Sequence, residues 1–408
     1  MRLIITDKVI LFGLILLLSR CAEDPSSSHR VKIDIEKTFE SNVGSFGSLQ
    51  SLSKVDNNHL ILAGWSSSSK NGAIPDDDVY IVKLNDALDS IWSKSFGGTK
   101  DDLVRCIVGT NDGGYLFCAT TSSNDGHIEN NQGDADIWLL KLDQTGEIQW
   151  SKTYGGSNYD GVNSNSIFLN ANGNYTIVGF TKSVDGDVNT HIGGDDIWVL
   201  EIDSQGEIIA QLTFGSAGND YPFAITRSDE NGYVILSKIG SSDATFDKPG
   251  IWVFNAGTDG NIIWKEHFDG LNAGIIRNTK DGGYIILNSV SQNTGDLAVY
   301  KIDNFGKTEW SKNFPFDNQE FPEDIIELDN GNFILLGTSD NQQFIGKILV
   351  IGIDTKGNKL YDEFYGSADV TGQSIVEMND GKIVIGGTKS VHTTFIKSSI
   401  LVLGLSSH

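Results

Sequence analysis

The chain has 408 residues, 46 glycines, only 6 prolines and a formal net charge of -24 at pH 7. Such an acidic surface repels phosphate backbones and anionic lipid head groups, so the composition excludes nucleic acid as a partner and leaves a lipid anchor as the route to a membrane. The glycine content, the 10% of aromatic residues and the scarcity of helical periodicity predict an all-β protein.

The first residues have the features of an export signal. Arg2 and Lys8 flank a short start, and residues 9–18 form the apolar run VILFGLILLL. This run is too short to cross a hydrocarbon core of about 30 Å as a helix, but it is typical of the core of a signal peptide. Residues 1–20 are therefore predicted to be a signal peptide.

The next residues predict a lipid anchor. LSRC resembles the lipobox at which bacterial lipoproteins are cleaved and acylated, which makes Cys21 the lipidation site, although Arg20 stands where the pattern has Gly, Ala or Ser. Residues 21–30 would then be a polar tether. A surface or outer-membrane lipoprotein is the preferred interpretation, and a secreted or periplasmic protein stays open because of Arg20.

A hairpin pattern, Asp-x-x-Gly between two apolar runs, occurs six times after this tether, and only its first copy lacks the glycine. Successive copies lie 46 to 60 residues apart, a spacing typical of the four-stranded blades of a β-propeller. The copies are KLNDALDSIW (83–92), KLDQTGEIQW (141–150), EIDSQGEIIA (201–210), NAGTDGNIIW (255–264), KIDNFGKTEW (301–310) and GIDTKGNKLY (352–361).

The other half of each repeat carries an Asp-Gly or Asn-Gly turn between apolar runs, as in NDGGYLFCATT and NANGNYTIVGFT. These dipeptides tolerate the positive φ of tight hairpin turns, so each repeat is predicted to contain four antiparallel strands, A to D. One position of strand B is occupied by small or short polar residues, as expected near a crowded axis: Ala63, Ala119, Gly179, Ser237, Asn288, Gly337 and Gly387.

The two ends of the chain complement each other. The last repeat, which begins near Ser374, stops before a strand D, and residues 31–39 (VKIDIEKTF) match a strand D that has no strand C before it. We therefore predict that residues 31–408 form a single seven-bladed β-propeller, closed by the N-terminal strand in the C-terminal blade. An open solenoid would leave that strand without a partner.

Two cysteines fall on strands A and B of one blade. A two-residue turn at Asp112 and Gly113 pairs Cys106 with Ala119, so that Cys106 and Cys118 point to opposite faces and form no disulfide. Both cysteines are therefore interpreted as small core residues. Arg105, Arg227 and Arg277 also lie on A strands and are expected to be solvated.

One rim of the propeller is predicted to bind a ligand. The long B–C loops and the D-to-A crossovers meet on this rim, and loops on a rigid scaffold are where binding residues concentrate. Asx-turns that cap the crossovers are the alternative, and they explain the acidic residues but not the aromatic ones. The candidate ligand-binding residues are Asp101, Asp102, Tyr159, Asp160, Asp220, Tyr221, Glu320 and Phe321.

Two B–C loops, residues 125–136 and 185–196, resemble calcium-binding loops. Both carry polar side chains at positions 1, 3, 5 and 7 and an acid at position 12, but position 6 is not glycine and the acid is Asp instead of Glu. A purely structural turn is therefore the preferred interpretation, and a calcium site is the alternative. No cofactor is required, and calcium is the candidate ion. The candidate ligands are Asp185, Asp187, Asn189 and Asp196 in one loop and Asp125, Glu129, Asn131 and Asp136 in the other.

Residues 150–206, which include WSKTYGGSNYDG and GGDDIWVLEIDSQG, resemble the bacterial β-propeller repeats called SBBP, and GDLAVYKIDNFG is similar to the delta-sixty repeats. LDQTGEIQW also resembles the docking motif of quinoprotein propellers, in which a strand-D tryptophan packs between blades. The resemblance implies a surface or secreted propeller of mostly unassigned function and supplies no catalytic residues.

The sequence favours a non-catalytic, monomeric envelope module that binds a protein or a glycan through the loop-rich rim. It contains no Ser-His-Asp grouping, Walker loop or zinc-ligand spacing. Two alternatives stay open: a glycosidase-like propeller that uses rim carboxylates, and a scaffold for envelope assembly.

Overall fold

The computed structural model describes residues 31–40, 46–68, 76–228, 232–269, 271–290, 295–340, 346–366, 369–392 and 396–407. The predicted signal peptide, Cys21 and the tether lie outside the described residues. Within these ranges the chain is all β, and they contain no helix that is long and apolar enough to cross a membrane.

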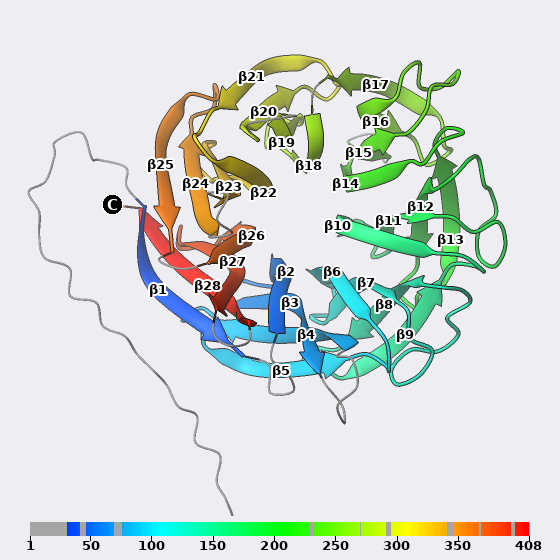
Figure 1. The fold of residues 1–408 in the computed structure, drawn as a ribbon, viewed down its shortest axis with the longest axis horizontal. Coiled ribbons are helices and arrows are strands. Elements are labelled where there is room, and N and C mark those ends of the chain that lie inside the picture. The colour runs from blue at the N-terminus through cyan, green and yellow to red at the C-terminus, as the bar shows by residue number, and fades with distance from the viewer. Residues whose placement is uncertain are drawn as a thin grey trace, which may run out of the picture.

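Seven four-stranded antiparallel sheets stand around a central axis like the blades of a propeller, as predicted (Figure 1). Blades 1 to 6 follow chain order. Blades 1 and 2 are formed by β2 (Phe46–Lys54), β3 (His59–Ser68), β4 (Asp76–Asn85) and β5 (Ser90–Phe96), and by β6 (Asp102–Gly109), β7 (Tyr115–Thr121), β8 (Asp136–Leu142) and β9 (Ile148–Tyr154). Blades 3 and 4 are formed by β10 (Asp160–Leu169), β11 (Tyr175–Thr181), β12 (Asp196–Ile202) and β13 (Ile208–Phe214), and by β14 (Tyr221–Arg227), β15 (Tyr233–Ile239), β16 (Gly250–Ala256) and β17 (Ile262–Phe268). Blades 5 and 6 are formed by β18 (Leu271–Asn278), β19 (Tyr284–Val290), β20 (Leu297–Ile302) and β21 (Thr308–Phe314), and by β22 (Gln319–Glu327), β23 (Phe333–Asp340), β24 (Gly346–Ile353) and β25 (Lys359–Tyr365).

Blade 7 joins the two ends of the described chain. It consists of β26 (Val370–Glu377), β27 (Ile383–His392), β28 (Ile396–Ser407) and, as its outer strand, β1 (Val31–Phe39). β1 pairs antiparallel with β28, from Val31 opposite Ser407 to Phe39 opposite Ile400. The predicted closure is therefore confirmed, and backbone hydrogen bonds hold the ring shut.

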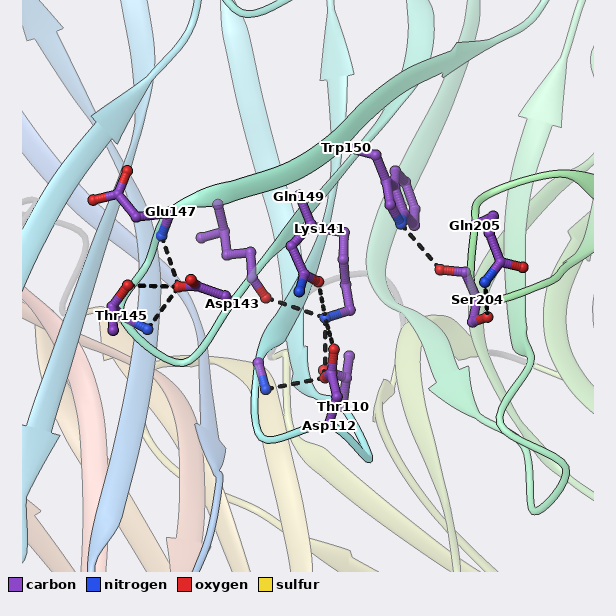
Figure 2. Close-up of polar contacts among 12 residues, drawn as sticks. Thr110, Asp112, Lys141, Asp143, Thr145, Glu147, Gln149, Trp150, Ser204 and Gln205 are labelled. Atoms are coloured by element: carbon purple, nitrogen blue, oxygen red, sulfur yellow. Dashed lines mark hydrogen bonds and ion pairs between the residues drawn. The ribbon is translucent and has the colours of Figure 1, made fainter.

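The recurring Asp-x-x-Gly motif forms the C–D turn of blades 2, 3, 5 and 6, and the variants Asn85-x-x-Leu88 and Gly257-x-x-Gly260 form that of blades 1 and 4. In blade 2, Asp143 Oδ1 accepts hydrogen bonds from the backbone N–H groups of Thr145 (2.7 Å) and Glu147 (3.0 Å), and Gly146 takes the left-handed conformation with φ +78° (Figure 2). In the first copy Leu88 adopts φ +60° without a glycine, and its side chain is buried. The aspartate therefore holds the turn through its hydrogen bonds, and the glycine allows the left-handed conformation without the steric cost that Leu88 bears.

Four of the C–D turns also receive a tryptophan from the preceding blade. Trp150 Nε1 donates a hydrogen bond to the carbonyl oxygen of Ser204 at 3.0 Å (Figure 2). A β-carbon added at Gly206 would lie 3.1 Å from the Trp150 ring, so the glycine makes room for the indole. The same pairing joins Trp92 to Gly146, Trp264 to Gly306 and Trp310 to Gly357. The packing that the docking-motif resemblance implied is therefore present.

A buried lysine ties the two hairpins of blade 2 together. Lys141 is 3% exposed, and its Nζ donates to Asp112 in the A–B turn (2.8 Å) and to Gln149 on strand D (2.8 Å), as Figure 2 shows. Burial alone would raise the pKa of Asp112, but hydrogen bonds from Lys141, Thr110 and the Gly114 amide lower this pKa to about 2. The buried ammonium group is thus paired with a carboxylate, as such groups require.

The predicted register of the two cysteines is wrong, whereas their interpretation as buried core residues is confirmed. The turn after β6 has a three-residue loop, in which Thr110 pairs with Gly114 and Gly113 takes φ +78°, instead of the two-residue loop that Asp-Gly suggested. The extra loop residue shifts the register by one position. Cys106 therefore lies directly opposite Cys118, and the two side chains point to the same face.

We predict that Gly357→Ala destabilises the protein more than Gly113→Ala does. Both glycines have φ +78°, so each alanine costs about 1 kcal/mol for the left-handed conformation. The β-carbon at position 357 would also lie 2.6 Å from the Trp310 ring, whereas nothing lies within 4 Å at position 113. Gly357→Ala should therefore lose about 1 to 3 kcal/mol more in a urea unfolding series. Equal losses would show that the tryptophan contact does not limit this position.

Candidate functional site

The inner strand of every blade contains a β-bulge. The pairing of strand A with strand B shifts between Leu49 and Ser51, Val104 and Cys106, Val162 and Ile167, Pro222 and Ala224, Leu271 and Gly274, Pro322 and Asp324, and Gly372 and Ser374. Bulges redirect side chains and are common beside functional sites. Because the inner strands surround the axis in Figure 1, the bulges put unpaired residues next to the centre of the ring.

A cavity of about 920 Å³ lies against these bulges, and we call it the channel cavity. Its wall comes from blades 2 to 6 and includes the start of strand A in blade 6, which belongs to the predicted rim. The lining residues are Arg105, Asn163, Ser164, Asn165, Phe223, Gly274, Ile275, Ser289, Val290, Gly295, Gln319, Glu320, Phe321, Pro322 and Glu323.

Two buried polar atoms on the wall of the channel cavity have no protein hydrogen-bond partner among the described residues. They are Nε of Arg105, a donor, and Oε2 of Glu320, an acceptor. The other carboxylate oxygen of Glu320 accepts a hydrogen bond from Ser339 Oγ at 3.1 Å. Buried polar groups are nearly always paired, so this donor and this acceptor mark the cavity as a place where a ligand can supply the partners.

The two glutamates that line the channel cavity, Glu320 and Glu323, have raised pKa values. Burial, reinforced by the charges of Asp296 and Asp317, raises the pKa of Glu320 to about 7. Burial, reinforced by the charge of Asp324, raises the pKa of Glu323 to about 8, although Thr338 Oγ1 donates a hydrogen bond to its carboxylate at 2.9 Å. Near neutral pH these carboxyl groups can therefore both accept and donate hydrogen bonds.

The prediction that the arginines of the A strands are solvated is wrong for Arg277, which forms hydrogen bonds to other inner strands. Its Nη2 donates to Asp324 Oδ1 at 2.8 Å and to Asn165 Oδ1 at 2.7 Å, which links blades 3, 5 and 6. The other oxygen of Asp324 accepts a hydrogen bond from Ser374 Oγ in blade 7 at 3.2 Å. In contrast to Arg277, Arg105 forms no ion pair among the described residues, so its charge is available in the cavity.

Three of the predicted ligand-binding aspartates are buried in the crossovers. Asp160 accepts hydrogen bonds from the Gly156 amide (2.8 Å) and from Ser183 Oγ (2.7 Å). Asp102 and Asp220 are equally inaccessible and accept the amide hydrogens of Gly98 and Ser216. The capping alternative from the sequence accounts for these three residues. Asp101 is exposed, and its Oδ1 accepts a hydrogen bond from the Asp77 amide at 3.2 Å.

The predicted aromatic residues form accessible surface on the rim. Tyr159 is 43% exposed and stacks on Phe180, with ring centroids 5.8 Å apart, and Phe180 meets Tyr221 edge to face at 5.3 Å. The hydroxyl group of Tyr221 donates to Asp195. Phe321 is 42% exposed and lines the channel cavity beside Glu320. Of the predicted rim residues, Glu320 and Phe321 are therefore the two that line the channel cavity.

Three crossover glycines, Gly97, Gly155 and Gly215, each separate two buried carboxylates. A β-carbon at Gly215 would lie 2.7 Å from Asp220 Oδ2 and 2.9 Å from Asp196 Oδ1. Gly155 stands in the same way between Asp160 and Asp136. Burial, with the charges of Asp160 and Asp187, raises the pKa of Asp136 to about 7. The glycine of the Tyr-Gly-Gly landmark is therefore required by the paired side chains behind it.

Six of the eight candidate calcium ligands accept hydrogen bonds from the backbone of the loops and crossovers. Asp185 Oδ1 accepts the Ser157 amide and Asp125 Oδ1 accepts the Thr99 amide, both at 2.8 Å. In the described residues, no three His, Cys, Asp or Glu side chains gather as a metal site would require. The remaining candidates are placed as follows: Asp187 accepts from the Gly155 amide, Asn131 from the Gly133 amide, Asp136 from the Gln132 amide and Asp196 from the Ile192 amide, and Glu129 and Asn189 are exposed. Calcium binding stays a prediction.

Sequence reasoning missed Arg105, Phe223 and Glu323 as site residues. Each stands at the bulge of its strand, where the alternation of inward and outward side chains is interrupted. The sequence indicates these site residues only weakly: the bulge position of strand A recurs in every blade, but it holds different charged or aromatic residues in blades 2, 4 and 6. That signal has no period and is recognisable only after the blades are aligned.

We predict that Glu323→Gln changes the pH dependence of stability. The pKa of Glu323 in the folded protein is about 8, above its ordinary value of 4.5, so its contribution to stability is complete at acidic pH and is lost as pH rises toward 8. The thermal midpoint of the wild type should fall from pH 5 to pH 8 relative to that of Glu323→Gln. Glu266→Gln, on the exposed outer strand β17, should follow the wild type. A wild-type curve parallel to that of Glu323→Gln would contradict the raised pKa.

We predict that Gly155→Ala is strongly destabilising. The new β-carbon would lie 2.7 Å from Asp160 Oδ2 and would also overlap the Asp136 carboxylate, so two buried aspartates would have to move. An overpacked site of this kind typically costs about 1 to 3 kcal/mol. Gly109→Ala is the control, because its nearest neighbour would be Val55 at 3.6 Å. A loss no larger than that of the control, measured by urea unfolding, would show that the aspartate pair adapts freely.

The calcium prediction is tested by thermal unfolding with added calcium and with EDTA. An ion that binds the folded state must raise the unfolding midpoint by mass action. Calcium should raise the midpoint of the wild type and should not raise that of Asp185→Ala. The absence of any shift in the wild type would remove calcium from both loops.

Comparison with known proteins gives similarity to solved structures alone. No protein-family model and no curated protein matches the chain. A Dyadobacter fermentans protein of unknown function is 13% identical, with a TM-score of 0.53, over 93% of this chain and 99% of that chain. Drosophila Semaphorin 1b, extracellular domains 1–2, is 9% identical (TM-score 0.49) over 92% of this chain and 87% of that chain. At 13% identity the similarity to the Dyadobacter fermentans protein supports a shared fold alone, while the SBBP resemblance stays a prediction.

Proposed function

We propose that the protein is an exported, non-catalytic binding module, and that the channel cavity is its ligand site. The observation that carries the proposal is that two residues lining the cavity each have a buried polar atom without a protein partner among the described residues, the Arg105 donor and the Glu320 acceptor. A ligand that fills the cavity and pairs with both atoms would recover the free energy that their desolvation costs.

The chemistry of the wall favours a neutral glycan. A sugar hydroxyl group donates and accepts hydrogen bonds, so it suits the Arg105 donor, the Glu320 acceptor and the amide groups of Asn163 and Asn165 alike. Phe321 offers an exposed aromatic face for the apolar side of a sugar ring. The net charge of -24 disfavours anionic glycans, which the acidic rim would repel.

The location that suits this function is the cell surface. The predicted signal peptide, lipidation at Cys21 and the tether of residues 21–30 would hold the propeller at the envelope, where it would act as a monomer. A protein ligand on the same rim is the competing outcome, because Tyr159 and Asp101 are exposed there. A scaffold role in envelope assembly would be recognised by stable protein partners instead of glycans.

A glycosidase activity is the second candidate, and one observation favours it. Glu320 and Glu323 line the same cavity, and both have raised pKa values, as a catalytic general acid requires. This alternative predicts release of reducing sugar that is lost in Glu323→Gln. Binding without turnover at substrate concentrations that saturate the site would exclude it.

The binding proposal is tested with a panel of neutral and acidic oligosaccharides by calorimetry. Arg105→Gln should weaken the binding of a neutral ligand by roughly tenfold or more, because a hydrogen bond to a charged group contributes about 1.5 to 3 kcal/mol. Arg227→Gln is the matched control, since Arg227 is on an inner strand but donates to the Leu169 carbonyl group outside the cavity.

Equal losses of affinity in Arg105→Gln and Arg227→Gln, or an unchanged affinity in Arg105→Gln, would overturn the proposal that the channel cavity is the ligand site. If no sugar binds and a purified envelope protein does, the glycan class falls and the protein alternative replaces it.

A further inference from the structure

The two cysteines of blade 2 form a directly opposed cross-strand pair. The three-residue loop between β6 and β7 sets the register, so Cys106 faces Cys118 on neighbouring antiparallel strands. The β-carbons of directly opposed residues lie about 4.5 to 5.5 Å apart, just beyond the range of about 3.5 to 4.5 Å found in disulfides. A closing movement of roughly 1 Å would therefore bring the two sulfur atoms to bonding distance.

The two cysteines are buried and are surrounded by tightly packed side chains. Cys106 is 5% exposed and Cys118 is 0% exposed, and both pack in the hydrophobic cluster between blades 2 and 3. The two thiol groups contact each other, and the Sγ of Cys106 lies 3.4 Å from Ser166 Oγ on β10. No third cysteine lies within the described residues, so each thiol has one possible partner there.

The two thiols differ in acidity. Burial alone would raise the pKa of Cys106, but hydrogen bonds from Cys118 and Ser166 and the charge of Arg277 lower it. Burial and the neighbouring Cys106 raise the pKa of Cys118. Since the thiolate is the nucleophile in thiol–disulfide exchange, Cys106 is the residue that attacks first.

We propose that Cys106 and Cys118 form a structural disulfide when the chain folds in an oxidising compartment. The Cys106 thiolate attacks a disulfide-bearing oxidant, which releases one thiol of the oxidant and leaves a mixed disulfide. Cys118 then loses its proton and displaces the second thiol, which closes the Cys106–Cys118 bond. Two protons and two electrons leave the protein, and the oxidant is reduced to a dithiol.

The bond would act on the bulge that carries Arg105. Arg105 is the unpaired residue between Val104 and Cys106, so a covalent link at Cys106 would fix one side of this bulge to β7. The disulfide would also reduce the freedom of the unfolded chain, which raises the stability of the fold. The proposal requires export but does not rest on glycan binding, because it depends only on the register and burial of the two cysteines.

The test uses the full chain, exported with its own signal, and the chain without residues 1–20 produced in a reducing cytosol. Each protein is unfolded in excess alkylating reagent without a reductant and is digested with trypsin. Both cysteines fall in one peptide, residues 106–141, because no lysine or arginine occurs between Arg105 and Lys141. We expect this peptide to be unalkylated and two hydrogen atoms lighter in the exported protein, and doubly alkylated in the cytosolic one.

A doubly alkylated peptide from the exported protein would overturn the proposal. The readout is a mass and therefore does not depend on ligand binding or on the folding of a variant. Cys118→Ala provides a second measurement: a reductant should lower the thermal midpoint of the exported wild type and leave that of Cys118→Ala unchanged. An equal response of both proteins would contradict a stabilising bond.

Discussion

The contact between a strand-D tryptophan and the turn glycine of the next blade is the constraint on which the ring depends. A single four-stranded blade exposes two apolar faces, so it is stable only against neighbours. Trp150 covers the edge of this interface and donates a hydrogen bond to the Ser204 carbonyl group of the following blade. The contact requires a glycine at positive φ, which is why the same residue serves both the shape of the turn and the packing of the blades. Blade 3 lacks the tryptophan, and there Leu212 packs against Gly260 instead.

Once the ring is closed, repeated and non-repeated residues have different tasks. The recurring aspartates, such as Asp102 and Asp160, are buried and hold the crossovers. The residues that differ between blades stand at the inner bulges and line the channel cavity, among them Arg105, Phe223 and Glu323. A scaffold made by repetition therefore leaves recognition to the positions where the repeat is broken. This division explains why the most conspicuous acidic residues of the sequence are structural, while a less conspicuous arginine carries the proposed binding site.

The bulge of β6 connects the two proposals. On its inner side Arg105 reaches the channel cavity, and beside it Cys106 turns toward the interface between blades 2 and 3. A disulfide at Cys106 would restrict the bulge and so hold Arg105 in place before a ligand arrives, which lowers the entropy cost of binding. The two proposals can nevertheless fail separately, because the redox state of the cysteines and the affinity for a sugar are measured independently.

By itself the sequence determined the number of blades, the four-strand repeat and the closure by residues 31–39, because turn residues and apolar alternation recur with one period and the two ends supply complementary strands. It also indicated the rim on which Glu320 and Phe321 lie. Only the tertiary structure decided the register of Cys106 with Cys118, the burial of Asp102, Asp160 and Asp220, and the cavity residues Arg105 and Glu323. The physical reason is that one extra residue in a turn or a bulge costs little local free energy and does not change the period of the sequence pattern. It nevertheless exchanges the two faces of a strand, and packing against neighbouring blades then selects the register.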